Sequence, residues 1–292
     1  MCKEPLSVLF GRAVPWGGAL NTDEYAKMFA LEDRYWWFVA RRRLALGLLR
    51  PPPPAPSTWG ATPEESTHNL ASRPSADPPA TNHAGEGVPV VLDLGCGTGV
   101  VLSELASWAV PVGLDMSALA LDFCRKRGLS RLATGDGTAM PFAALAFDAM
   151  VGLDVFEHIE DDEAAFAQAY RALRPGGRLV LSVPAFRFLW GPHDAALHHF
   201  RRYTRGEMVA RLVAAGFVVD RCTYSVFLLF PLVVVWRLFE KRKRGPAKAS
   251  LVALPEWANR LLIGIQGVEA WITRWTDLPW GSSVVAVARR PE

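Results

Sequence analysis

The sequence predicts an α/β fold in which a doubly wound, mostly parallel sheet carries helices on both faces. Between residue 88 and about residue 225, short apolar runs alternate with helical stretches, which is the pattern of such a sheet. The first run, VVLDL at residues 90–94, is rich in β-branched and leucine side chains, as expected of a strand buried on both faces. A glycine-rich turn follows this run directly, where doubly wound sheets bind their ligands.

The candidate strands are short apolar runs separated by stretches with helical periodicity. They lie at residues 90–94, 110–115, 132–134, 147–153 and 178–183, followed by 217–224 and 283–289. The candidate helices between them lie at residues 117–127, 162–173 and 205–215. The segment PGG at 175–177 is expected to close the second of these helices.

Composition divides the chain into five segments. Residues 1–50 form an N-terminal helical lid segment, with a helix that starts at a Thr22 or Asp23 cap. Residues 51–87 are rich in Pro, Ser, Ala and Thr without periodicity, which predicts a disordered insertion. Residues 88–225 form the core, residues 226–276 are an apolar helical insertion, and residues 277–292 hold the final strand.

Bulk properties indicate a globular protein. The chain has 292 residues, of which 50% are hydrophobic and 21% charged, enough for one domain with additions. A net charge of +3 does not by itself indicate nucleic-acid binding. The four cysteines form no CxxC pair, which favours reduced thiols in the cytoplasm over disulfides or a zinc site. The N-terminus does not resemble a signal peptide, and the apolar run at 226–236 is shorter than the ~20 residues of a spanning helix.

The turn after the first strand contains Gly95, Gly97 and Gly99. Glycine costs backbone entropy, so three of them in five positions indicate positive φ angles or the close approach of a bound ligand. Position 100 is Val, so the third glycine of the dinucleotide fingerprint GxGxxG is absent.

Three acids lie in or just after the first three predicted strands. Asp93 lies within the first strand and Asp115 ends the second, where a carboxylate can accept hydrogen bonds from both hydroxyls of a ribose. Asp136, in GDG after the third strand, could accept from an adenine amino group, although GDG is also ordinary turn chemistry.

Together these motifs resemble the class I S-adenosylmethionine-dependent methyltransferases, and most closely the branch that acts on small molecules, quinones, sugars and lipids. The matching motifs are VLDLGCGTG (91–99), GLD (113–115), GDGTAMPF (135–142), FDAMVGLDVFEHI (147–159) and LRPGGRLVLSVP (173–184). The resemblance implies a Rossmann-like, seven-stranded sheet whose last strand, SVVAVAR at 283–289, is antiparallel to the others.

The resemblance also implies a site for S-adenosyl-L-methionine, and no metal site is expected. Asp93, Gly95, Gly97 and Gly99 would surround the methionine part, with Asp93 near its ammonium group. Asp115 would hold the ribose, and the adenine would lie against Met116, Asp136 and Gly137. Leu153 and Asp154 end the fourth strand, where sulfonium and acceptor meet in this family.

Candidate bases follow the fourth and fifth strands. His158 in VFEHIED either lines the cofactor pocket, as the resemblance implies, or acts as a base. The loop FRFLWGPHDAALHHFRRYT (186–204) supplies His193 as the first choice of base, with Asp194 to orient it, and Tyr203 as a further candidate. Trp190, His198 and Arg202 are candidate substrate contacts, although a solvated helix face would explain them too. His198 and His199 cannot be separated, because a helix points them about 100° apart.

The N-terminal segment LEDRYWWFVARRR (31–43) places aromatic side chains around much of a helix. One interpretation is core packing. The other is a lid over the acceptor that uses Tyr35 or Trp37, with Arg41–Arg43 facing an anionic substrate.

Residues 226–276 bear on the acceptor. They combine a short apolar segment, a basic cluster at 241–244 and an apolar stripe with helical spacing, which is typical of helices in a membrane interface. A hydrophobic substrate cap or a dimer face are the alternatives, and the oligomeric state is not predicted.

We therefore expect a cytoplasmic methyltransferase, peripheral to the inner face of the membrane, with a small hydrophobic or lipid-linked acceptor and a weak preference for O-transfer. One rival is a nucleic-acid or protein methyltransferase. The D/N-P-P-Y/F motif of base-amino methylation is absent, since residues 153–156 read LDVF, and no nucleic acid is expected as a partner. The other rival is a non-catalytic S-adenosylmethionine-binding partner subunit.

Overall fold

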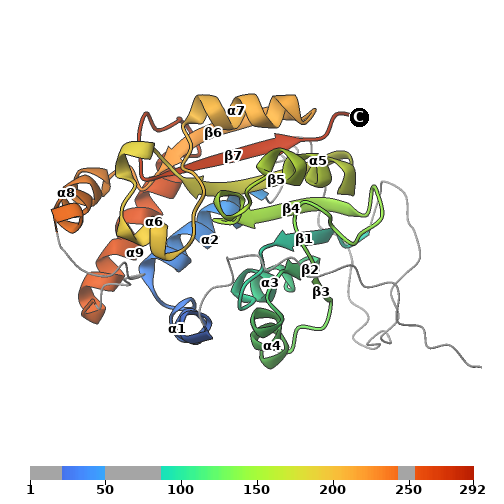
Figure 1. The fold of residues 1–292 in the computed structure, drawn as a ribbon, viewed down its shortest axis with the longest axis horizontal. Helices are drawn as coiled ribbons and strands as arrows, with labels where there is room; N and C mark the ends of the chain where they lie inside the picture. The colour runs from blue at the N-terminus through green and yellow to red at the C-terminus, as the bar shows by residue number, and fades with distance from the viewer. Residues whose placement is uncertain (1–21, 50–86, 243–253) are drawn as a thin grey trace, which may run out of the picture.

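The computed structural model describes residues 22–49, 87–242 and 254–292. In these parts the chain forms one seven-stranded sheet with helices on both faces (Figure 1). The strands lie in the order β3-β2-β1-β4-β5-β7-β6. Their bounds are β1 (Val90–Leu94), β2 (Val110–Asp115), β3 (Leu132–Thr134), β4 (Phe147–Leu153), β5 (Leu173–Pro184), β6 (Val218–Ser225) and β7 (Ser283–Arg289).

Strands β1 to β5 are parallel, and β7 lies antiparallel between β5 and β6. Both features of the predicted fold class are confirmed, namely the doubly wound sheet and the antiparallel last strand. The strand order reverses between β1 and β4, so the carboxyl ends of these two strands border the crevice where such sheets bind ligands.

The helices connect the strands and precede the sheet. They are α1 (Thr22–Leu31), α2 (Trp36–Leu49), α3 (Val100–Leu105), α4 (Ala118–Lys126), α5 (Asp162–Ala172), α6 (Pro192–Ala196), α7 (Arg205–Ala214), α8 (Phe230–Arg242) and α9 (Glu256–Ile272), with the 3₁₀ turns η1 (Phe156–His158) and η2 (Arg187–Leu189).

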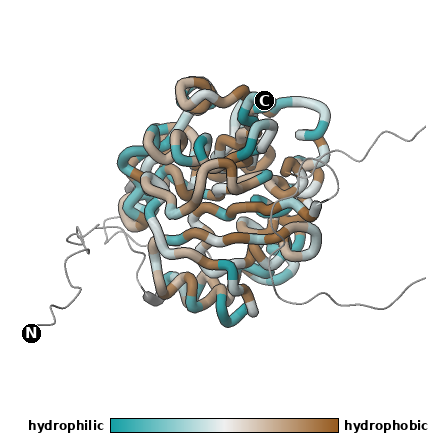
Figure 2. The backbone as a smooth tube through the Cα atoms, turned by 90° about the vertical axis from the view of Figure 1, so that its right-hand side faces the viewer, coloured by the Kyte–Doolittle hydropathy of each residue, from teal (hydrophilic) through white to brown (hydrophobic). Residues whose placement is uncertain are grey.

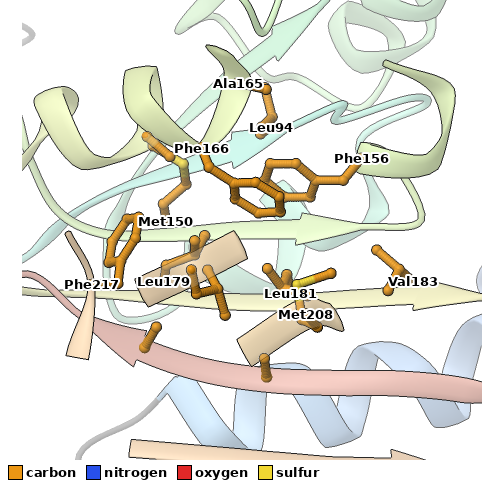
Figure 3. Close-up of a cluster of buried hydrophobic side chains, with 14 of the residues drawn as sticks. Leu94, Met150, Phe156, Ala165, Phe166, Leu179, Leu181, Val183, Met208 and Phe217 are labelled. Atoms are coloured by element: carbon orange, nitrogen blue, oxygen red, sulfur yellow. The ribbon is translucent and has the colours of Figure 1, made fainter. Parts of the chain in front are cut away.

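Two apolar layers hold the helices on the sheet. On one face, α5 and α7 cover a cluster in which the rings of Phe156 and Phe166 stack 4.4 Å apart, with Met208 of α7 nearby (Figure 3). On the other face, α2, α3 and α4 bury a second cluster that includes Leu46, Leu105 and Val180. Figure 2 shows the corresponding apolar segments running through the middle of the molecule. Because both faces are covered, the strands read as continuous apolar runs.

Two expected elements differ from the structure. The N-terminal segment is two helices, because the chain turns at residues 32–35, where the buried Glu32 side chain pairs with Arg127 instead of continuing the helix face. Strand β5 begins at Leu173, so PGG lies inside the strand, and a register shift in its pairing with β4 accommodates Gly176 at φ 73°. The expected disordered insertion lies at residues outside the described ones, apart from residue 87, and so do the side chains of the Thr22 or Asp23 cap.

Helices α8 and α9 lie between β6 and β7 in the chain and form one end of the molecule in Figure 1. Among the described residues, no helix combines the length and hydrophobicity that crossing a bilayer requires. Helix α9 packs on α2, which itself lies on β4, β5 and β7. The N-terminal helix α2 thus connects the core to the apolar insertion.

Candidate active site

The glycine turn after β1 has the backbone geometry that the sequence indicated. Gly95, Gly97 and Gly99 have φ angles of 68°, 53° and 90°. A Cβ on Gly95 would lie 2.5 Å from Cγ2 of Val155, in the loop after β4. Positive φ and close approach therefore both require glycine here.

Asp115 fastens this turn to the end of β2. Its Oδ2 accepts a hydrogen bond from the Gly97 N–H at 2.9 Å, and its Oδ1 accepts one from the Ser117 N–H at 2.8 Å. Burial raises the pKa of Asp115, and these backbone donors oppose that rise. Each carboxylate oxygen has a second lone-pair site, so the group retains acceptors for ribose hydroxyls.

Asp93 tests whether the site fits the cofactor. Its side chain is buried, and within the described parts of the chain its Oδ2 has no hydrogen-bond partner. Burial raises its pKa well above the usual range, and the charge of Asp115 adds to this. An unpartnered buried carboxylate is costly, so a cationic ligand group fits here. The ammonium group of S-adenosylmethionine is such a group.

Helix α1 covers the glycine turn, which sequence reasoning did not detect. Met28 lies so close that its Cε would be 2.9 Å from a Cβ on Gly97. Tyr25 is buried beside Asp115 and Ser117. The Thr98 hydroxyl of the turn donates to Glu32, just beyond the helix. The only sequence signal was the helical segment ahead of β1, which was interpreted as a lid over the acceptor rather than over the cofactor.

The predicted adenine contacts surround the end of β3. Met116 is 51% exposed, so its side chain is available to a ligand. Asp136 accepts a hydrogen bond from the Thr138 N–H at 2.8 Å through Oδ1. Gly137 is buried, and a Cβ there would lie 2.9 Å from Cδ1 of Ile159. Their roles toward adenine stay predictions.

The end of β4 contacts the N-terminal segment. Leu153 is buried and Asp154 has a φ of 52°. The Asp154 carboxylate pairs with Arg41 of α2, and its N–H donates to the Ser182 carbonyl at 2.8 Å. Helix α2 thus carries a cation to the position where the resemblance places methyl transfer.

A narrow cavity of about 20 Å³ adjoins this ion pair. It lies between α2, α9 and the ends of β5, β6 and β7, and its lining includes Trp36, Trp37, Arg41, Ser182, Gln266 and Glu269. Trp37, a predicted substrate contact, is therefore at the cavity. Tyr35 does not line it and packs against the rings of Trp36 and Phe38. A cavity of this size holds about one water, so α2 and α9 would have to separate to admit an acceptor.

The structure brings together histidines from the loops after β4 and β5. The ring centroids of His158 and His199 are 4.6 Å apart, and those of His193 and His199 are 6.4 Å apart. Burial lowers the pKa of His158 to about 3, with a contribution from His199. Burial and the charge of Arg237 lower the pKa of His193 to about 4. Both rings are therefore neutral at pH 7, the form in which an imidazole accepts a proton.

Glu157, the neighbour of His158 within η1, completes this group and had no role in the sequence analysis. It is fully buried, and burial raises its pKa well above the usual range, with a further contribution from Asp154. The adjacency of Glu157 and His158 in VFEHIED was the available sequence signal.

Three predicted residues of the 186–204 loop have other contacts. The side chain of Arg202 is buried and donates to both carboxylate oxygens of Asp194. Tyr203 donates to Asp162 at 2.7 Å, and burial raises the pKa of its hydroxyl. The protein itself thus engages both groups, and their substrate and catalytic roles stay predictions. His198 is exposed at φ 56°, whereas His199 points inward. Trp190 is half-buried and its role stays a prediction.

The strand order, the glycine turn and the acids at the ends of β1 and β2 define a class I S-adenosylmethionine-dependent methyltransferase fold and cofactor site. Comparison with known families agrees, since a family model described as a methyltransferase domain matches residues 92–181. Residues 92–181 therefore carry a methyltransferase domain.

Relatives and solved structures extend the comparison. Demethylmenaquinone methyltransferase of Thermus thermophilus is 40% identical over 99 residues, which are 31% of this chain and 45% of that protein. A Mycolicibacterium smegmatis protein named as a probable S-adenosylmethionine-dependent methyltransferase is 32% identical over 142 residues, 47% of this chain and 54% of that one. The chain thus spans about half the length of these curated relatives.

Among solved structures, a S-adenosylmethionine-dependent methyltransferase of Thermotoga maritima superposes with a TM-score of 0.53 and 16% identity, over 92% of this chain and 95% of that one. A chain from a Haloferax volcanii complex of the Trm112 methyltransferase activator with a methyltransferase gives a TM-score of 0.55 and 18% identity, with the same coverage. At this level of identity the likeness concerns the fold.

Proposed function

We propose that the protein transfers the methyl group of S-adenosylmethionine to a small hydrophobic or lipid-linked acceptor. The observation that supports this methyl donor is Asp93, a buried carboxylate beside the glycine turn with one oxygen that has no hydrogen-bond partner among the described residues. Asp115, at the same crevice, offers the acceptors for a ribose. These groups bind a nucleoside that carries a positive charge, which is what S-adenosylmethionine is.

For an acceptor hydroxyl, the reaction is an in-line displacement at the methyl carbon. The oxygen–carbon bond forms while the carbon–sulfur bond breaks, and the bonding electron pair stays on sulfur, which leaves neutral. The hydroxyl proton goes to a base. His193, a neutral imidazole in the loop after β5, is our first candidate for that base, and His158, after β4, is the alternative; an available base supports O-transfer.

A hydrophobic acceptor is supported by what surrounds the narrow cavity. Two tryptophans of α2 line it, and the other wall is α9, whose outer surface is apolar. The named activity of the T. thermophilus relative, methylation of demethylmenaquinone, is compatible with such an acceptor, although the match covers 31% of this chain.

We further propose that α8 and α9 lie against the cytoplasmic face of a membrane. In α9, Trp257, Leu261, Val268 and Trp271 are all more than half exposed, whereas Gln266 and Glu269 are buried. In an amphipathic helix of a soluble protein, the apolar side chains are buried and the polar ones exposed, which is the reverse of what α9 shows. Exposed apolar surface of this kind marks an interaction site. Tryptophan suits the headgroup region of a bilayer, and the sequence also contains a basic cluster at residues 241–244, a composition that anionic lipid attracts.

Two measurements test the proposed function. Calorimetric titration of the purified chain with S-adenosylhomocysteine is expected to give saturable binding. Labelled methyl groups from S-adenosylmethionine are then expected to appear in the lipid extract of the native cell. Binding without incorporation into any extract would favour a non-catalytic partner subunit. Incorporation into the nucleic-acid or protein fraction would favour a nucleic-acid or protein methyltransferase. Absence of S-adenosylhomocysteine binding would contradict these two alternatives and the proposed function alike.

A further inference from the structure

We propose that Glu157, His158 and His199 bind a divalent transition-metal ion. We call these three residues the Glu–His cluster. One ligand atom from each of them lies within 4.8 Å of the other two, with no change to the fold. The proposal replaces the expectation, made from sequence, that the site holds no metal, and it stands on geometry that does not depend on the methyl donor.

The first argument is the state of the Glu157 carboxylate. Its side chain is 0% exposed, and in the described parts of the protein neither of its oxygens has a hydrogen-bond partner from another residue. Two unpartnered carboxylate oxygens in the interior are expensive to bury. Arg41 and Arg202 act on the group only through their charge, and both donate to other acids, Asp154 and Asp194. A cation coordinated by Glu157 would satisfy it directly.

The second argument is the orientation of the two imidazoles. Nδ1 of His199 lies 2.9 Å from Oδ1 of the buried Asp194, which leaves Nε2 of His199 for a metal. One ring nitrogen of His158 faces the backbone of Leu197, whose interaction raises the pKa of the ring, and this leaves the other nitrogen for a metal. A metal-binding histidine typically makes such a second hydrogen bond to a carboxylate or carbonyl, which fixes its tautomer and ring orientation.

The third argument is that Asp194 is itself held in place. Arg202 donates to both of its carboxylate oxygens, at 2.8 and 3.0 Å, and the Gly191 N–H donates to Oδ2 at 2.9 Å. These donors fix the position of the carboxylate that orients His199.

The ligand set selects the class of metal. Two imidazole nitrogens and one carboxylate oxygen suit Mn²⁺, Fe²⁺, Co²⁺ or Zn²⁺, whereas Mg²⁺ and Ca²⁺ prefer oxygen ligands throughout. The three ligand atoms now lie within 4.8 Å of one another. Metal–ligand bonds of about 2.0–2.2 Å require them to move closer together than this. Three protein ligands leave at least one coordination position open.

Cobalt binding tests the proposal. The untagged full chain, stripped of metal with a chelator, is titrated with Co²⁺ while its visible d–d absorption is recorded, and calorimetry repeats the titration with Mn²⁺ and Zn²⁺. Glu157→Gln and His199→Ala remove one ligand each. Glu160→Gln is the matched control, because Glu160 is exposed three residues further along the same loop. Circular dichroism and cooperative melting verify that each variant is folded.

We expect saturable binding of one ion per chain, with affinity reduced about tenfold or more in both ligand variants and unchanged in the control. The proposal is overturned if the wild-type chain shows no saturable binding, or if folded Glu157→Gln and His199→Ala bind the ion as tightly as Glu160→Gln. His158→Asn replaces any ligand variant that does not fold. S-adenosylhomocysteine titration of the same samples reports on the methyl-donor site separately, so the failure of one proposal is distinguishable from that of the other.

Discussion

The imidazole rings of His158 and His199 meet at 88°, with their centroids 4.6 Å apart, although one follows β4 and the other follows β5. The Phe200 N–H donates to the Glu157 carbonyl at 2.8 Å and joins the same two loops through the backbone. The loops after β4 and β5 are thus one connected structure at the carboxyl edge of the sheet. Whatever chemistry occurs at that edge depends on both.

Substitution of the two adjacent histidines should have unequal effects on stability. His199→Ala removes a donor from the buried Asp194, which we expect to lower the free energy of unfolding by about 1–3 kcal/mol. His198 is exposed at a positive φ that Asn tolerates, so His198→Asn should stay within about 0.5 kcal/mol of wild type. Urea unfolding measures both, and equal effects would contradict the inward orientation of His199.

The glycine turn gives a second stability contrast. Gly95→Ala introduces a Cβ 2.5 Å from Cγ2 of Val155 at a φ of 68°, and should lower the free energy of unfolding by about 2–4 kcal/mol. Gly264→Ala, in the exposed middle of α9 where a Cβ meets nothing within 4 Å, should raise it by about 0.5–1 kcal/mol. The two urea midpoints are expected to shift in opposite directions. A neutral Gly95→Ala would mean that the turn is not packed as described.

Asp115 should be required for binding of the cofactor product. Asp115→Ala removes the acceptor of the Gly97 N–H as well as the expected ribose contact, so affinity for S-adenosylhomocysteine should fall on the order of tenfold or more. Asp122→Ala is the control, because Asp122 is an exposed acid on α4 that pairs only with Arg125 among the contacts described for it. Calorimetric titration compares the variants, and an unchanged affinity in Asp115→Ala would remove this residue from the site.

The fold was predictable because the core signals are local. An apolar run such as residues 90–94 indicates a buried strand whatever elements pack against it. Its predicted bounds match those of β1. The PGG segment was misread because Pro and Gly usually end an element, whereas here a register shift between β4 and β5 accommodates them. The break between α1 and α2 depends on Glu32 and Arg127, which lie far apart in the sequence.

The site was predictable where one residue type at one position serves the ligand, as for Gly95 and Asp115. The roles of site residues were not predictable where they depend on contacts between residues far apart in the sequence or on the fold of a loop. Nothing local distinguishes His198 from His199, and only the fold of the loop turns one of them toward Asp194. Glu157 went unassigned because its significance is the lack of a partner in the interior, which sequence does not show.

The raised pKa of Asp93 predicts proton release on cofactor binding. In the free protein, burial disfavours the Asp93 anion and raises its pKa, whereas an ammonium group beside it favours the carboxylate and lowers the pKa again. The complex therefore holds fewer protons, and affinity for S-adenosylhomocysteine should rise as the pH increases through the raised pKa of Asp93. Calorimetry in buffers of different ionisation enthalpy, from about pH 5 to about pH 8, measures the release. Asp93→Asn should abolish it, and release that persists in this variant would assign the proton to another group.

The apolar surface of α9 should bind anionic lipid. Trp271 of α9 and Trp275, just after the helix, are 59% and 78% exposed. Changing both to Gln should weaken binding to phosphatidylglycerol-containing vesicles about tenfold or more, because bilayer attachment scales with buried apolar area. Val213→Gln is the control, since Val213 is 57% exposed but lies on α7. Binding measured by vesicle flotation should also weaken at high salt, because lipid charge is screened. If the wild-type chain stays in the aqueous fraction while the tryptophan variant alters its oligomeric state, the surface is a contact between copies of the chain and the membrane proposal fails.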